Sequence, residues 1–139
     1  MPARLVAVLA AVALFCAACG GRGPEDVVRA WSDALATKDD AAAAAHFVER
    51  PIIIQGLLPT RPSSQEAIER WHSTLECAGR IVGMAVEGRR VTATFELHDR
   101  PESRCPARGF QTTVVFNVED GLILTWEQKP PGWVPDYEE

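Results

Sequence analysis

The stretch VVFNVEDGLILTW (residues 114–126) has the pattern of a β-hairpin. It contains two runs of β-branched and aromatic residues separated by Asp120-Gly121, a pair that is typical of tight β-hairpin turns. We therefore expect a strand over residues 109–118 and a second over 122–128, paired antiparallel across this turn.

The same pattern occurs earlier in the chain. Residues 80–87 and 90–98 read as strands, and Gly88-Arg89 supplies the turn between them. The C-terminal half thus predicts a meander of four long strands.

The N-terminal half has helical spacing instead. Pro24 opens the first pattern, and Glu25 and Asp26 place negative charge where the helix dipole favours it. Its apolar residues form one stripe that ends before Thr37: Val27, Val28, Trp31, Ala34 and Leu35.

Three further elements are predicted between this helix and the meander. They are a second helix over residues 41–47, a short strand over 52–54 and, after a loop over 56–62, a third helix from a capping box at Ser63 and Glu66 to Leu75. Because helices and strands are segregated along the chain, the sequence predicts an α+β domain with four long antiparallel strands plus a short one on three N-terminal helices.

The N-terminus reads as an export leader. Residues 5–15 carry no polar side chain, but this run is shorter than the roughly 20 residues needed to span a bilayer. Cys19 after Ala17-Ala18 resembles the lipobox of bacterial lipoproteins, although Cys16 stands where Leu, Val or Ile is usual. We predict a signal peptide over 1–18 and a lipid-modified tether over 19–23, with cleavage for ordinary secretion, or a cytoplasmic chain, as the alternatives.

The mature chain has room for one domain, which we place at residues 24–129, followed by a proline-rich tail over 130–139. Loss of Arg4 with the leader leaves 13 basic and 19 acidic side chains, a formal balance of about -6. The chain carries no concentrated basic block, so nucleic acid is not an expected partner.

Two cysteines lie within the predicted domain. If Glu87 and Arg90 flank the first hairpin turn, Cys77 faces about Arg100, close to the loop that carries Cys105. In an oxidising compartment this pair predicts a disulfide. The alternative is two unrelated thiols.

This order of elements resembles the nuclear transport factor 2-like superfamily, including its SnoaL-like polyketide cyclase branch. The resemblance lies in VRAWSDAL (residues 28–35) with Lys38-Asp39-Asp40, in Phe47, and in residues 114–126. It implies that the curved antiparallel sheet forms a cone around the first helix, with a pocket open at one end. It also implies a homodimer formed through the outer face of the sheet.

Within that superfamily, the layout is similar to that of ketosteroid isomerase. The tyrosine, the aspartate base and the protonated acid of that enzyme correspond approximately to Trp31, Gln55 and Thr113 here. None of these three side chains can perform the same task, because an indole, an amide and a hydroxyl neither accept a proton near neutral pH nor replace a carboxylic acid. Isomerase chemistry of that kind is therefore not expected.

The remaining reactive side chains suggest no other chemistry. His46, His72 and His98 lack the spacing of metal ligands, and capping or solvent-facing roles explain them; no Gly-x-Ser-x-Gly motif occurs. We predict neither a metal site nor a cofactor. The residues expected around the pocket are Trp31, His46, Gln55, Trp71, Thr113 and Trp126. For the three tryptophans, ordinary core filling is favoured over lining an open cavity.

The functional expectation is an envelope lipoprotein outside the cytoplasm, anchored to a membrane at Cys19. Its domain would serve as a ligand-binding or protein-interaction module, with a small apolar molecule as the ligand. The alternative is a SnoaL-like enzyme, namely a cyclase, isomerase or hydrolase acting on a small apolar substrate.

Overall fold

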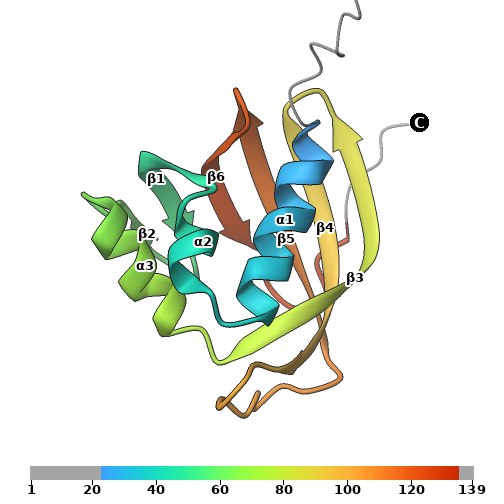
Figure 1. Cartoon of the computed structure of the whole chain (residues 1–139). Coiled ribbons are helices and arrows are strands. Elements are labelled where there is room, and N and C mark those ends of the chain that lie inside the picture. Colours follow the sequence, from blue (N-terminus) through green and yellow to red (C-terminus); the bar gives the residue numbers. More distant parts are fainter. Residues whose placement is uncertain (1–22, 135–139) are drawn as a thin grey trace, which may run out of the picture.

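The computed structural model describes residues 23–134, which form an α+β domain around a curved six-stranded sheet (Figure 1). The strand order is β2-β1-β6-β5-β4-β3. The predicted leader, Cys19 and the end of the tail lie outside the described residues. Within residues 23–134, no helix is both long enough and apolar enough to cross a membrane.

Three helices precede the four-strand meander. They are α1 (Pro24–Ala36), α2 (Asp40–Ala44) and α3 (Gln65–Ser73). The side chain of Asp39 caps α2 by accepting a hydrogen bond from the Ala42 N–H at 3.0 Å. The cap of α3 is Ser64, which accepts from the Ala67 N–H at 3.1 Å, so the predicted cap at Ser63 was one residue too early.

The strands are β1 (Phe47–Ile54), β2 (Pro59–Thr60), β3 (Cys77–Glu87), β4 (Arg90–Asp99), β5 (Gln111–Glu119) and β6 (Leu122–Gln128). The four-strand meander is confirmed. The second helix was predicted too long, because Phe47 already belongs to β1 and pairs with Ile123. The predicted loop over 56–62 contains the short strand β2.

The strand β1 is longer than predicted because Pro51 does not end it. The register of β1 against β6 shifts between Phe47 and Ile52. A proline lacks the N–H that a sheet ladder requires, and it is tolerated inside a strand where the pairing is irregular. The strands β1 and β6 run parallel, whereas the other pairs are antiparallel.

Both predicted hairpin turns are present. Asp120 and Gly121 have positive φ angles of 51° and 77°, as a turn that follows the twist of its strands requires. In the first hairpin Glu87 pairs with Arg90 as expected, but a shift in register between Ile81 and Gly83 places Cys77 opposite Asp99 instead of Arg100. The pairing was therefore predicted correctly near the turn and is one residue off at the far end.

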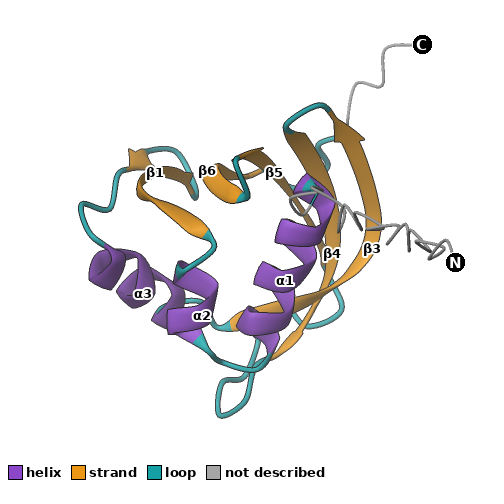
Figure 2. Cartoon of the chain, turned by 45° about the horizontal axis from the view of Figure 1, so that its top comes forward, coloured by secondary structure: helices purple, strands orange, loops and turns teal. Residues whose placement is uncertain are grey.

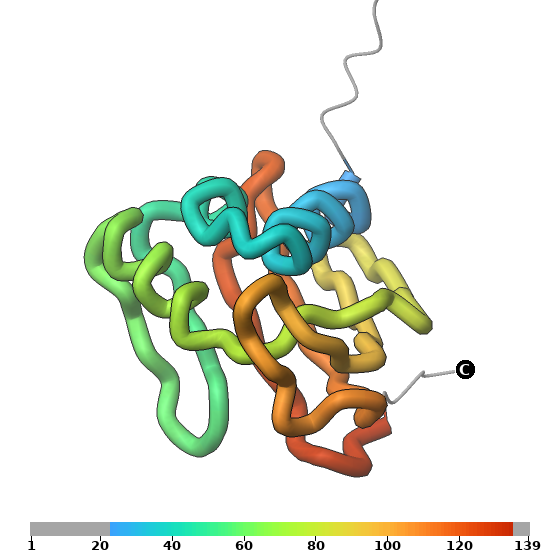
Figure 3. The backbone as a smooth tube through the Cα atoms, turned by 60° about the horizontal axis from the view of Figure 1, so that its bottom comes forward, coloured from blue at the N-terminus to red at the C-terminus, as the bar shows by residue number. Residues whose placement is uncertain are grey.

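The helices cover one side of the sheet (Figure 2). The core lies between α1 and the concave face, where Trp31 packs edge-on against Phe95, Phe116 and Trp126 with ring centroids 5.3–6.4 Å apart. Edge-to-face contacts at these distances are favourable for aromatic rings. The 100–110 loop comes forward in Figure 3.

Candidate functional site

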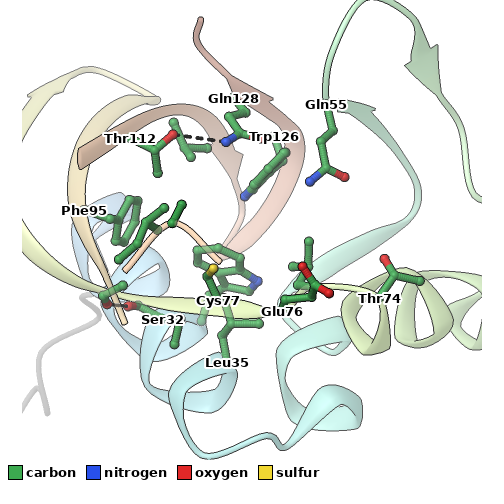
Figure 4. A pocket seen from close by; sticks show the side chains of 17 residues that line it. Ser32, Leu35, Gln55, Thr74, Glu76, Cys77, Phe95, Thr112, Trp126 and Gln128 are labelled. Carbon is green, nitrogen blue, oxygen red and sulfur yellow. Dashed lines mark hydrogen bonds between the residues drawn. The ribbon is translucent and has the colours of Figure 1, made fainter. Parts of the chain in front are cut away.

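A cavity of about 290 Å³ lies between the second half of α1 and the concave face of the sheet, at the end where β3 begins (Figure 4). Its apolar wall includes Trp31, Leu35, Phe95, Val114 and Trp126. Its neutral polar side chains are those of Ser32, Gln55, Thr74, Thr112 and Gln128, and Glu76 is the charged side chain among the lining residues. Glu76 is exposed.

Three of the six residues predicted around the pocket line this cavity: Trp31, Gln55 and Trp126. Trp71 lies directly behind them, with its Nε1–H donating to Gln55 Oε1 at 3.2 Å and its ring centroid 4.9 Å from that of Trp126. Trp31 and Trp126 therefore form part of the cavity wall, with Trp71 packed behind Trp126, and they do not fill the space.

The other two predicted residues, Thr113 and His46, are not among the lining residues. Thr113 Oγ1 lies 3.1 Å from the hydroxyl of Thr94 on β4, on the opposite face of the sheet. Successive residues of a strand alternate between faces, so its neighbour Thr112 lines the cavity in its place. His46 lies in the turn before β1, where its carbonyl accepts from the Ile123 N–H at 2.7 Å.

The indole N–H groups of the three tryptophans differ in their partners. Trp31 Nε1–H donates to His72 Nε2 at 2.9 Å, and Trp71 Nε1–H donates to Gln55. Trp126 Nε1 is buried and has no hydrogen-bond partner among the described residues. Buried polar groups without a partner are rare in folded proteins, so this donor needs an explanation.

His72 is a core residue, which corrects the prediction that it faces solvent or caps a helix. Its side chain is fully buried, Nε2 accepts from Trp31, and Nδ1–H donates to the Ile68 carbonyl at 2.8 Å. These two bonds require the neutral ring. Burial lowers the pKa of His72 to about 4. The i, i+4 spacing of Ile68 and His72 was the sequence signal that could have placed it on the buried face of α3.

Arg100, which sequence reasoning missed, is buried below the cavity. Its guanidinium donates to the carbonyls of Leu35 at 3.1 Å, His72 at 2.8 Å and Leu75 at 2.6 Å, and it pairs with the carboxylate of Asp40. It thereby joins the C-terminal ends of α1 and α3, where the helix dipole favours a cation and each carbonyl can accept a second hydrogen bond. No feature of the local sequence distinguishes Arg100 from the exposed arginines that follow it.

The predicted disulfide between Cys77 and Cys105 is present. Cys77 is a lining residue, and the loop that carries Cys105 also brings Ala107 to the cavity wall. The Cys105 N–H donates to Asp99 Oδ1 at 2.8 Å, and this bond is the main reason why the pKa of Asp99 is lowered. The disulfide therefore holds the loop that carries Cys105 and Ala107 against the start of β3 at one side of the cavity.

The lining of the cavity is mostly apolar and uncharged. Among the lining residues, Glu76 is the one side chain with an acidic or basic group, and it stands exposed at the rim. Residues 23–134 contain no group of three or more His, Cys, Asp or Glu side chains placed to hold a metal ion. What the cavity offers is apolar surface and neutral hydrogen-bonding groups, as ligand pockets commonly do.

No protein-family model matches the sequence, and no curated protein is significantly similar to it. Solved structures are similar. A nuclear transport factor 2-like protein of unknown function from Cytophaga hutchinsonii superposes with a TM-score of 0.65 at 14% identity, over 80% of this chain and 92% of that chain. A candidate polyketide cyclase from Sinorhizobium meliloti gives 0.62 at 19% identity, over 75% and 94%. A candidate ketosteroid isomerase from Kribbella flavida gives 0.64 at 14% identity, over 83% of each chain.

Proposed function

We propose that this chain, whose fold is nuclear transport factor 2-like, is an extracytoplasmic module that binds a small, largely apolar ligand and is held at a membrane by a lipid on Cys19. The observation that carries the ligand-binding part is the cavity of about 290 Å³ beside the Trp31–Trp126 wall. Its volume suits a ligand of one or two fused rings.

Two features support binding without catalysis. The three positions that correspond to the acid and base groups of ketosteroid isomerase hold Trp31, Gln55 and Thr113, and the last of these lies on the opposite face of the sheet. The Trp31 N–H is already engaged by His72. A general acid or base must lie within hydrogen-bond reach of the atom it serves, and no buried lining residue offers one.

Tetralin, a bicyclic hydrocarbon, is a suitable probe of the cavity. We expect it to bind the disulfide-bonded protein and to shift the amide resonances of the lining residues in NMR titrations. Thr112→Phe should abolish this binding, because a ring on β5 at this position occupies the space beside Gln128, to which the Thr112 hydroxyl is now bonded at 3.1 Å.

The matched control is Thr94→Phe, which adds the same ring to the opposite face of the neighbouring strand. Tetralin should bind this variant as it binds the original protein. Binding that survives Thr112→Phe, or that both variants lose equally, would place the tetralin elsewhere and contradict the proposed site.

The membrane part of the proposal has its own test. Cells that produce the whole chain should yield a mature protein that begins at Cys19 and carries the added mass of a diacylglycerol group. Globomycin, which blocks the lipoprotein signal peptidase, should prevent cleavage before Cys19. An unmodified product that begins at another residue would refute the anchor and leave the ligand-binding part standing.

The alternative is a SnoaL-like enzyme, and one observation favours it: the Glu76 carboxylate lies at the rim of the cavity. Turnover of a bound apolar molecule that Glu76→Gln abolishes, with binding retained, would support this alternative. A homodimer formed through the outer face of the sheet remains a prediction, to be checked by the molecular mass in solution.

A further inference from the structure

We propose that the Trp126 indole N–H is the group that selects the ligand, and that the ligand is an uncharged, mostly apolar molecule with a hydrogen-bond acceptor, such as a carbonyl oxygen, facing this donor. The inference rests on the proposed ligand-binding function. It adds the polarity of the ligand and the residue that recognises the acceptor atom of the ligand.

The first support is the contrast among the three indoles of the cluster. Trp31 and Trp71 each donate to a neighbouring side chain, at 2.9 Å and 3.2 Å. Trp126 is 4% exposed and its Nε1 has no acceptor within residues 23–134. An indole nitrogen can only donate, and burying it without a partner is unfavourable. An acceptor that enters with the ligand removes this cost.

The second support is that the Trp126 ring is held in place. It packs edge-on against Trp71, with ring centroids 4.9 Å apart, and against Trp31, at 6.4 Å. These contacts and the burial of the ring restrict how far the donor can turn toward a different partner. In Figure 4 the Trp126 ring lies on the cavity wall between Gln55 and Phe95, with its nitrogen at the end of the ring nearer Phe95.

The third support is the charge of the lining. It contains no Lys, Arg or His side chain, so nothing there compensates an anionic ligand. Because the Trp71 N–H must bond to the oxygen of Gln55, the Gln55 amide presents its Nε2 donor. The cavity therefore offers Trp126 Nε1 and Gln55 Nε2 as donors, which fits a neutral molecule that carries acceptor oxygens.

The test compares 1-tetralone with tetralin, two molecules of nearly the same shape of which the first has a carbonyl acceptor. Trp126→Phe keeps an aromatic ring and removes the N–H. In NMR titrations of the disulfide-bonded protein, this variant should lose about three- to tenfold in affinity for 1-tetralone, the worth of one neutral hydrogen bond. Its affinity for tetralin should change less than twofold.

The outcomes separate this inference from the proposed function. If both probes bind and the variant weakens them equally, or weakens neither, Trp126 does not select an acceptor and the inference falls while the binding module stands. If neither probe binds the original protein at millimolar concentration, the proposed function and the inference fall together.

A measurement on the unaltered protein guards against misfolding of the variant. The indole N–H resonance of Trp126 is identified as the one that Trp126→Phe removes, or by sequential assignment. It should move downfield with 1-tetralone and stay in place with tetralin. A resonance that 1-tetralone leaves unmoved while it shifts other lining residues would overturn the inference.

Discussion

Replacing Arg100 with methionine should lower the free energy of unfolding by about 3–5 kcal/mol, the usual cost of removing one partner from a buried ion pair. The side chain of Arg100 is 1% exposed and serves four acceptors, namely three helix-end carbonyls and the Asp40 carboxylate. Methionine fills much of the same volume but donates nothing. Asp40 would then be left without its partner, and the ends of α1 and α3 would lose their shared donor.

Urea unfolding followed by circular dichroism measures this loss. Arg80→Met is the matched control, because Arg80 pairs with Glu96 at 3.2 Å where both side chains are largely exposed. Such a pair contributes about 0–1 kcal/mol. Arg100→Lys should also be strongly destabilising, since one ammonium group cannot reach all four acceptors. A loss below 1 kcal/mol for Arg100→Met would contradict the role of Arg100 as the joint between the helices.

Acidification should destabilise the domain through His72. Burial lowers the pKa of this histidine to about 4 from an ordinary 6.5; the Ile68 hydrogen bond and Asp40 oppose the shift, and Arg100 and His46 add to it. Between these two pH values the unfolded chain binds a proton that the folded protein does not. The free energy of unfolding therefore falls as the pH falls through this window, by about 2 kcal/mol between pH 7 and pH 5 and about 3 kcal/mol once below pH 4.

The contribution of His72 is isolated by comparison with His72→Gln. Glutamine can accept from Trp31 and does not titrate, so the stability of the variant should depend less steeply on pH between 6.5 and 5. Urea unfolding at a series of pH values gives the two curves, and carboxylates such as Asp99 contribute equally to both. Parallel curves in this range would show that His72 does not stay neutral in the folded protein.

Much of the fold follows from local sequence patterns. The Asp120-Gly121 turn between two β-branched runs predicted the last hairpin, and Gly88-Arg89 predicted the first, because each pair accommodates backbone angles that the turn requires. The stripe of α1 predicted its buried face. The disulfide between Cys77 and Cys105 was predicted although the register was one residue off, because both cysteines lie at the same end of the sheet.

Two predictions, those for Pro51 and Thr113, were wrong because local sequence does not fix the register of a strand. Pro51 normally signals a break, but an irregular register of β1 against β6 accommodates it, and that register depends on a strand more than seventy residues further along the chain. Thr113 was expected in the pocket and Thr112 lies there, because a misplacement by one residue reverses the face of a strand.

The three helices, the two hairpins, the α+β class and the meeting of the cysteines at one end of the sheet follow from periodicity, turn chemistry and spacing along the chain. The burial of Arg100, the neutral state of His72 and the lack of a partner for Trp126 Nε1 among residues 23–134 depend on how the chain packs. The reason is that burial and hydrogen bonding are set by residues from distant segments: Arg100 meets Leu35, and Trp31 meets His72. No local sequence pattern predicts contacts between such distant residues.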